Sequence, residues 1–475
     1  MRLRAELKYL IILILNGIIL WWGIFASAHW LFIILILTWV NMMLYSYSRI
    51  GKRVLLFAFG VTFFVFLIGR EFLEQYLHYP ISDHFTKEVI AHTYLSIWLA
   101  LISVCGSFSL FSSLKSRTRR KYRDSYYFAP KIRFYSKLVF WFTYPFAIIF
   151  NLVIAFFVAK VGYLAYYTEF SGFISQVPYL YVLSKIELMT SAAFCVFLST
   201  LPPKEDFKIP CRAYIIYILL SLGSGQRSGF LLGLMILFVF VNFMQEIRPE
   251  EKWFDKRYMR YVVLAVPVIA VAGSLFNSWR FEESENDVKF LDVFFRFFYE
   301  QGVSSYVVKR AYELENEIPG GVLYCLEFLH SGIPARILGI EVYNGNTVEH
   351  ALYGNSFTHA LGYTVLGKNY LNGAGTGSSY IAELYYDFGY IGIILGSILY
   401  GWMFSLFTKG AESSIFKRSL LFIIITKLLW APRGAYTAFI SFICAPSTIL
   451  MLLFIFGMAH IKTNRTPLLA GHGTK

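Results

Sequence analysis

The chain is poor in charge and in cysteine for its length. Only 15% of its 475 residues are charged, whereas a typical soluble domain has about 25%. The five cysteines are scattered without a Cys-x-x-Cys pair, so the sequence predicts neither a disulfide framework nor a cysteine metal site. There is also no Walker motif and no His-Glu-x-x-His motif, and we therefore expect neither an ATP site nor a metal or other cofactor.

Apolar residues make up 57% of the chain and fall in long runs. Runs of about 18–25 residues span the ~30 Å hydrocarbon core of a bilayer, where a helix satisfies its own backbone hydrogen bonds. This pattern excludes a cytosolic enzyme, a nucleic-acid-binding protein and a disordered scaffold. The sequence predicts an all-α polytopic integral membrane protein with about twelve transmembrane helices, at residues 8–27, 30–47, 54–72, 89–113, 138–160, 178–200, 211–223, 228–245, 260–279, 380–407, 418–434 and 436–460.

Lysine and arginine indicate how these spans are oriented. If the N-terminus is cytoplasmic, the loops on that side hold 29 of the 43 basic residues, and the short loops on the other side hold five. Because basic residues collect on the cytoplasmic side of membrane proteins, the sequence predicts that both termini are cytoplasmic. Contact of these loops with anionic headgroups explains the net charge of +14, and we expect no nucleic-acid partner.

One long loop interrupts the predicted spans. We expect transmembrane helices 1–9 within residues 1–279, a large extracytoplasmic loop at 280–377, helices 10–12 within 378–460, and a cytoplasmic tail at 461–475. Long ordered loops are usually functional. Within this loop, residues 290–299 combine Phe, Tyr and Arg at a spacing typical of a helix that lies along the membrane surface.

Three arginines lie at the predicted outer ends of spans, where a charge is energetically costly. Arg227 lies in the turn at 223–229, Arg280 opens the long loop, and Arg433 lies in Ala-Pro-Arg-Gly at 431–434. A guanidinium donates paired hydrogen bonds to phosphate oxygens, so three converging arginines suit a diphosphate. The alternative is that each arginine reaches to the lipid headgroups, as long basic side chains do near a membrane surface.

A glycine-rich turn at residues 373–379 leads into the predicted helix that follows the loop. Gly375, Gly377, Ser378 and Ser379 precede the N-terminus of that helix, where free backbone N–H groups suit an anion. No strand precedes the glycines, so the sequence does not predict a dinucleotide-binding fold.

Two residue types suited to proton transfer lie on either side of this turn. Ser379, Glu383 and Asp387 share one helical face, and carboxylates in an apolar span are expected to line a cavity or pair with arginines. Glu383 is a candidate general base, with a structural counter-ion of an outer arginine as the alternative. His359 is a second candidate because histidine titrates near neutral pH, with an ordinary polar loop residue as the alternative.

The layout of spans with one large late outer loop resembles the Wzy-type polymerases, which build bacterial O-antigen, capsular and exopolysaccharide chains from oligosaccharide repeat units. The resemblance covers nearly the whole chain. The short segments that carry it are Gly225–Gly229, Gly375–Glu383 with Asp387–Gly389, and Ala431–Gly434.

The resemblance implies a GT-C-like architecture and a metal-independent glycosyltransferase at the outer face of the bacterial cytoplasmic membrane. The growing glycan would pass from undecaprenyl diphosphate to a new lipid-linked repeat unit, with release of undecaprenyl diphosphate. On this interpretation Arg227, Arg280 and Arg433 stabilise the diphosphate, and Glu383 or His359 is the base. The implied partners are the lipid bilayer, the lipid-linked repeat unit and growing glycan, and a chain-length regulator and flippase.

Three other functions remain open from the sequence. An O-antigen ligase shares the layout and the donor but uses another acceptor. A lipid-phosphate-sugar-dependent glycosyltransferase usually has a large first outer loop, which is short here. A flippase or transporter would use Lys185 and Lys427 within spans, but such proteins are often built from internal repeats, and we find none.

Overall fold

The computed structural model describes residues 9, 11–19, 28–77, 79, 84–114, 122–162, 168–169, 178–225, 227–253, 290–320, 323–410 and 413–461. Over these residues every regular element is a helix, as the sequence predicts. In chain order the helices are α2 (Ala28–Tyr47), α3 (Ile50–Phe63), η1 (Phe64–Ile68), α4 (Gly69–Tyr76), α5 (Lys87–Ser113), α6 (Tyr122–Val161), α9 (Pro178–Ser199), α10 (Lys204–Leu220), η2 (Ser221–Ser224), α11 (Ser228–Ile247), η3 (Pro249–Glu251), α13 (Phe290–Gln301), α14 (Val303–Glu313), η4 (Tyr324–His330), α15 (Gly332–Leu338), α16 (Val348–Tyr353), α17 (Phe357–Leu366), α18 (Lys368–Leu371), α19 (Tyr380–Thr408), α20 (Ile415–Trp430), η6 (Ala431–Arg433), α21 (Ala438–Ile443) and α22 (Pro446–His460).

Eight helical stretches in the described part of the chain are long and apolar enough to cross a membrane. They match the predicted spans two to eight and ten, so a multi-pass membrane protein is confirmed. The predicted spans at 418–434 and 436–460 correspond to shorter helices, α20 with 16 residues and α22 with 15. The predicted span at 260–279 lies outside the described residues, as does half of the span at 8–27. A count of twelve and a GT-C-like architecture therefore stay predictions.

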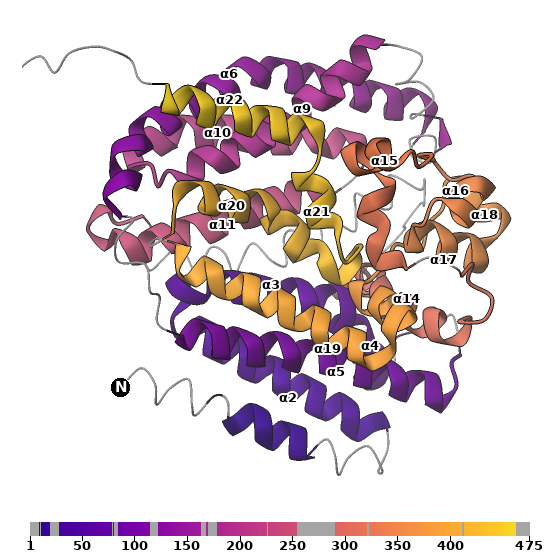
Figure 1. Cartoon of the computed structure of the whole chain (residues 1–475). Helices are drawn as coiled ribbons and strands as arrows, with labels where there is room; N and C mark the ends of the chain where they lie inside the picture. Colours follow the sequence, from indigo (N-terminus) through magenta and orange to yellow (C-terminus); the bar gives the residue numbers. More distant parts are fainter. Residues whose placement is uncertain are drawn as a thin grey trace, which may run out of the picture.

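The long helices run side by side, and their chain directions define two ends of the bundle (Figure 1). At one end, which we call the basic end, Lys52 pairs with Glu246 at 2.8 Å and Arg133 pairs with Asp206 at 3.4 Å. At the other end α13–α18 gather, and we call it the loop end. The segregation of the basic residues between the two sides of a membrane stays a prediction.

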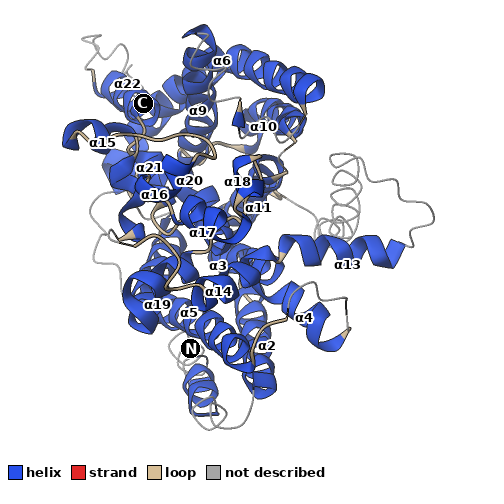
Figure 2. Ribbon diagram, turned by 90° about the vertical axis from the view of Figure 1, so that its right-hand side faces the viewer, coloured by secondary structure: helices blue, strands red, loops and turns tan. Residues whose placement is uncertain are grey.

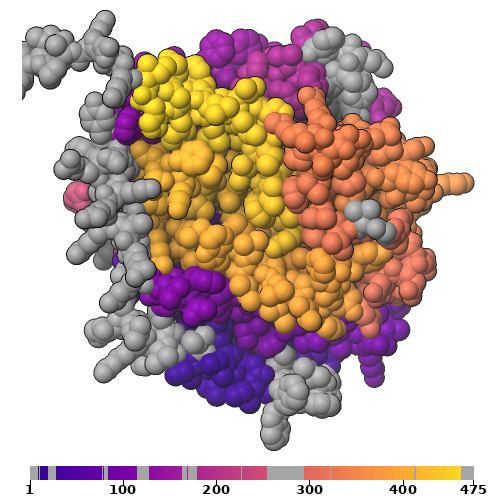
Figure 3. Space-filling model, viewed as in Figure 1, coloured from indigo at the N-terminus to yellow at the C-terminus, as the bar shows by residue number. Residues whose placement is uncertain are grey.

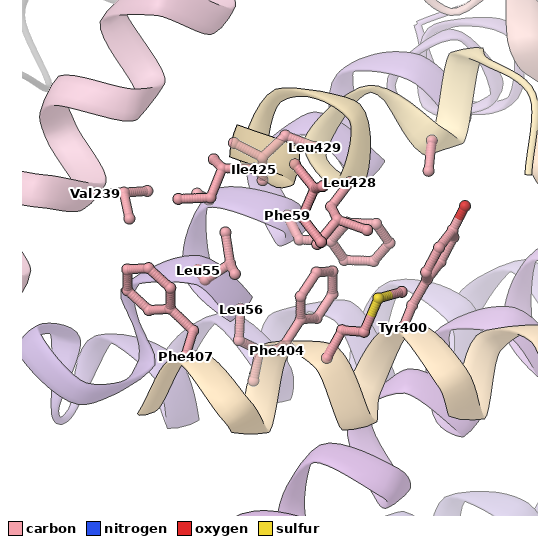
Figure 4. Close-up of a cluster of buried hydrophobic side chains, with 14 of the residues drawn as sticks. Leu55, Leu56, Phe59, Val239, Tyr400, Phe404, Phe407, Ile425, Leu428 and Leu429 are labelled. Atoms are coloured by element: carbon pink, nitrogen blue, oxygen red, sulfur yellow. The ribbon is translucent and has the colours of Figure 1, made fainter. Parts of the chain in front are cut away.

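Four helices from distant parts of the chain share the centre of the bundle (Figure 4). Phe59 of α3 packs on Phe404 of α19 with ring centroids 4.9 Å apart, and Phe407 packs on Phe243 of α11 at 4.8 Å. Leu428 of α20 lies in the same cluster and is fully buried. These contacts hold the C-terminal half of α19 against α3 and α11, and Phe407 also packs on Phe422 of α20 with ring centroids 5.3 Å apart.

The third span changes its helical form near the loop end. After α3 the chain forms η1, a single π-helical segment, and continues as α4. A π segment shifts the faces of the residues that follow it, and such segments are frequent at functional sites. Here it precedes Arg70, Glu71 and Glu74, all of which are buried.

Residues 290–377 form a set of short helices over the loop end. Figure 3 shows them beside the C-terminal segments on one continuous surface. The helix predicted at 290–299 is present as α13. Seen along the bundle, α13 extends sideways beyond the other helices (Figure 2), as a helix parallel to a membrane surface would. The position of this segment outside the cell remains a prediction.

Candidate functional site

The first turn of α19 places Glu383 in a fully enclosed position at the loop end. Ser379 caps the helix by accepting a hydrogen bond from the Ile381 N–H at 3.4 Å. Glu383 is 1% exposed. Its Oε1 accepts the Ser378 hydroxyl at 2.7 Å, and its Oε2 accepts the Tyr436 N–H at 2.7 Å. Glu383 therefore joins the glycine-rich turn to the chain that follows Arg433.

Asp387, one turn further along α19, binds a different element. Its carboxylate accepts the N–H groups of Tyr324 at 3.0 Å and Cys325 at 2.8 Å, which are the first two residues of η4. The Thr437 hydroxyl donates to the Cys325 carbonyl at 3.0 Å. Asp387 thus binds backbone N–H groups, and Glu383 binds a backbone N–H and a hydroxyl. Within the described residues, which exclude Arg280, no arginine is a hydrogen-bond partner of either carboxylate.

Glu327 of η4 is a third carboxyl at this site, and it was not among the residues predicted from the sequence. It lies close enough to Glu383 for the two groups to interact electrostatically, and it is hydrogen-bonded to Ser356. Burial raises the pKa of Glu327 above its ordinary value. The signal in the sequence was a lone carboxylate in the apolar stretch 324–329. Neighbouring carboxyls with different surroundings are suited to hold and to accept a proton.

Arg433 is the last residue of η6, and it lies three residues before Tyr436, whose N–H donates to Glu383. Its Nη1 donates to the carbonyl of Gln301, the last residue of α13, at 2.9 Å. The guanidinium lies 5.7 Å from the ring centres of both Phe66 and Trp430. The side chain is therefore held between η1, α13 and the end of α20.

Beside Gln301 lies a buried cluster of four charges, which we call the ion cluster: Arg70, Glu71, Glu74 and Lys309. Lys309 Nζ lies 2.7 Å from Glu71 and 3.3 Å from Glu74, and Arg70 Nε lies 2.9 Å from Glu74. Each residue is less than 9% exposed. The two positive and two negative charges balance, as buried charges require. None of these four residues was among the site residues predicted from the sequence.

The ion cluster contacts the chain that holds Arg433. Tyr299 of α13 accepts a hydrogen bond from Arg70 Nη2 at 3.0 Å. A side chain at Gly302 would collide with Arg70, so glycine allows α13 and α14 to approach α4 closely. The cluster therefore fixes the Gln301 carbonyl to which Arg433 donates.

Arg227 lies at the N-terminus of α11, next to a cavity of about 280 Å³. The cavity is in the loop-end half of the bundle. Its lining includes Ser228 and Gly229, which follow Arg227, and Lys427 and Trp430, which precede Arg433; the other lining residues are Glu187, Leu188, Ser191, Tyr214, Tyr217, Ile218, Ser221, Leu232, Gly233, Thr426 and Phe442. Two segments that are 200 residues apart in sequence thus border one space. Arg280 lies outside the described residues.

The glycine-rich turn has the geometry of a support for Glu383. Gly377 has φ +74°, a conformation that favours glycine, and it allows the chain to turn into α19. Ser378 and Ser379 are fully buried and bind Glu383 and the Ile381 N–H, respectively. Gly375 has open space around its Cα. Anion binding by this turn stays a prediction.

His359 belongs to a separate cluster on α17. Its ring stacks on His350 with centroids 3.6 Å apart, and its Nδ1 lies 2.8 Å from the Tyr370 hydroxyl. Burial, with a smaller effect of His350, lowers the pKa of His359 to about 3. In the described part of the chain no hydrogen bond connects this cluster to Glu383. The structure thus groups Glu383, Ser378 and the Arg433 segment, and it places His359 apart from them.

The structure defines a multi-pass, all-helical membrane protein with buried carboxyls and arginine-bearing turns at one end. A family model described as O-antigen polysaccharide polymerase Wzy matches residues 7–465, nearly the whole chain. The chain belongs to this family, which confirms the resemblance seen in the sequence and assigns it to the glycosyltransferase-type polymerases of O-antigen repeat units. No curated protein and no solved structure matches the chain.

Proposed function

We propose that this protein polymerises undecaprenyl-diphosphate-linked repeat units at the outer face of the bacterial cytoplasmic membrane. The observation that carries the proposal is the buried Glu383, which is tied through the Tyr436 N–H to the segment that bears Arg433. A proton acceptor and a cation that suits phosphate are thereby fixed to one structural unit. Membership of the polymerase family supplies the reaction class.

In the proposed step, a hydroxyl oxygen of the new lipid-linked repeat attacks the anomeric carbon of the growing glycan. The bond from that carbon to the diphosphate oxygen breaks, and undecaprenyl diphosphate leaves with the bonding electrons. Glu383 takes the hydroxyl proton, and Glu327 beside it offers a second carboxyl for the proton. Fixed cations stabilise the charge that develops on the leaving group without metal.

We assign the leaving diphosphate to Arg227 and Arg433, with Arg280 as a third ligand, and the base to Glu383 rather than His359. The His359 pKa of about 3 leaves a weak base at neutral pH, and its Nδ1 already faces Tyr370. Gly375, Gly377, Ser378 and Ser379 hold the turn that positions Glu383. The lipid bilayer, a flippase that delivers repeats and a chain-length regulator complete the proposed setting.

The orientation is part of the proposal. The basic end would face the cytoplasm, with both termini there, and the loop end would face outward, where flipped repeats are found. The acidic and aromatic side chains of residues 290–377 would then cover the reaction from the outside.

The test is the ladder of surface glycan on a gel, from a strain that lacks the gene and from complemented strains. Collapse of the ladder to one repeat on its final anchor supports polymerisation. Accumulation of lipid-linked polymer would instead identify a ligase, and repeats trapped on the cytoplasmic side would identify a flippase.

Arg433→Ala tests the site. At equal protein level we expect about 100-fold less polymer, the usual loss when one transition-state donor is removed. Arg433→Lys should recover only part, because lysine lacks the paired donors of a guanidinium. The control is Lys368→Ala, at an exposed residue of α18. An unchanged ladder in Arg433→Ala would remove Arg433 from the site.

A further inference from the structure

Lys427 places a positive charge on the wall of the cavity between α9, α10, α11 and α20. Its Nζ lies 5.4 Å from the centre of the Phe442 ring. It forms no ion pair or hydrogen bond with any residue in the part of the chain described here. A lysine within an apolar span is costly unless a partner of opposite charge is supplied. The cavity therefore favours an anionic occupant.

The start of α11 adds a second feature that favours an anion. Ser228 and Gly229 are the first two residues of this 20-residue helix, and both line the cavity. The N-cap residue, Arg227, makes no side-chain hydrogen bond to the first-turn N–H groups. These N–H groups have no partner inside a helix, and the helix dipole adds positive potential at the same place.

Glu187 and the apolar lining narrow the kind of anion. Glu187 accepts a hydrogen bond from the Tyr217 hydroxyl and forms no ion pair with Lys427. One ammonium and one carboxylate leave the empty cavity with little net charge, so the attraction for free inorganic anions is weak. The remaining wall includes Leu188, Ile218 and Leu232, which favours an anion attached to a hydrocarbon chain.

We propose that Lys427 and the N-terminus of α11 bind a phosphate group of a polyprenyl diphosphate in this cavity. The inference rests on the proposed function and extends it by naming where the lipid diphosphate binds and which lysine holds it. The cavity volume of about 280 Å³ is far above the 10–15 Å³ or so that one water requires. The lining residues of α11 follow Arg227 in sequence, and those of α20 precede Arg433.

The experiment measures binding to the purified full-length protein in nanodiscs. The probes are farnesyl diphosphate, inorganic pyrophosphate and farnesol. We expect the wild-type protein to bind farnesyl diphosphate more tightly than either of the other two. Lys427→Met should weaken farnesyl diphosphate binding by about tenfold or more, because a charge-assisted hydrogen bond is lost. Lys427→Arg should retain most of the binding.

The matched control is Lys417→Met, which changes an exposed lysine at the basic end of the same helix. If Lys427→Met does not fold, Gly229→Val offers a second variant, which fills the cavity at the helix end with Lys427 intact. Equal binding by wild type and either folded variant would overturn the inference. Pyrophosphate binding as tight as farnesyl diphosphate binding would also overturn the inference, because the site would then recognise a free anion.

The glycan ladder separates this inference from the proposed function. A ladder that collapses on gene deletion, together with unaffected binding by Lys427→Met, would retain the polymerase and reject the site. A ladder that survives deletion, together with weakened binding, would retain a lipid-diphosphate site and reject the polymerase.

Discussion

At the scale of single residues, His359 and Glu383 differ in what surrounds them. His359 lies between His350 and Tyr370, and nothing in its described environment supplies a negative charge to hold a proton. Glu383 receives two hydrogen bonds, one from a hydroxyl and one from a backbone N–H. Residue type alone made both side chains candidates for a base. Their neighbours and hydrogen bonds in the structure distinguish the two candidates.

The lowered pKa of His359 predicts acid sensitivity of the folded protein. Unfolded histidine has a pKa near 6.5, so below that pH the unfolded chain binds a proton that the folded chain refuses until about pH 3. The stabilising contribution is present above pH 6.5 and is lost as the pH falls. Between pH 7.5 and pH 5 this effect lowers the free energy of unfolding by about 2 kcal/mol.

We therefore expect acidification to lower the melting temperature of the His359→Phe variant less than that of the wild-type protein. Phenylalanine keeps an aromatic ring against His350. The measurement is thermal unfolding in detergent at pH 7.5 and pH 5. His84→Phe is the control, since His84 is exposed on the segment before α5. Equal acid-induced losses in wild type and His359→Phe would show that this histidine does not carry the effect.

At the scale of elements, the ion cluster connects α4 to α14. Glu71 and Glu74 lie on α4, and Lys309 lies on α14, more than 230 residues later in the chain. Glu71 also accepts the Tyr94 hydroxyl of α5 at 3.0 Å. Three elements at the loop end thus depend on one buried set of charges.

We expect Lys309→Met to destabilise the protein by about 3–5 kcal/mol, because two buried carboxylates would share the single remaining cation of the cluster. The measurement is thermal unfolding together with the amount of protein in the membrane. Adding Glu71→Gln to Lys309→Met should recover part of the loss by restoring charge balance. An exposed lysine of α18 provides the control, Lys368→Met. A loss as small as that control would mean that the cluster contributes little to stability.

At the scale of the whole molecule, the two ends of the bundle predict opposite accessibility in intact cells. We expect a membrane-impermeant maleimide to label Lys368→Cys at the loop end without permeabilisation. It should label Lys417→Cys at the basic end only after permeabilisation. Both variants are made in a chain with its native cysteines replaced by alanine. The reverse pattern would invert the proposed orientation and place the reaction on the cytoplasmic side.

Much of the fold was predictable because a bilayer imposes a simple rule on sequence. Spans appear as apolar runs, and eight such runs match long helices. Helix ends were less predictable. The helix α6 begins at Tyr122, well before the apolar run at 138, because the helix also includes the basic segment that precedes this run. The helices of residues 290–377 are short, and only α13 was predicted, from the spacing of its aromatic and basic residues.

The site was predictable where the signal was local. Glu383 was found because a carboxylate in an apolar span is rare. Glu327 and the Glu71–Lys309 pair were missed because their partners are distant in sequence and meet only through tertiary packing. Lys427 was noticed in the sequence, but only the structure shows that it lines the same cavity as the first residues of α11.

The close parallel packing of α5 on α19 has a consequence for how the protein is made. Gly401 faces Ser107 and Val104 so closely that any side chain there would collide. The His92 ring near the start of α5 is hydrogen-bonded to Tyr390 of α19 at 2.9 Å. Roughly 270 residues separate the two helices in sequence. At about 5–20 residues synthesised per second, α19 is therefore made some 15–50 s after α5. During that interval α5 lies without its α19 partner, so the His92–Tyr390 hydrogen bond and the close approach at Gly401 form only late in synthesis.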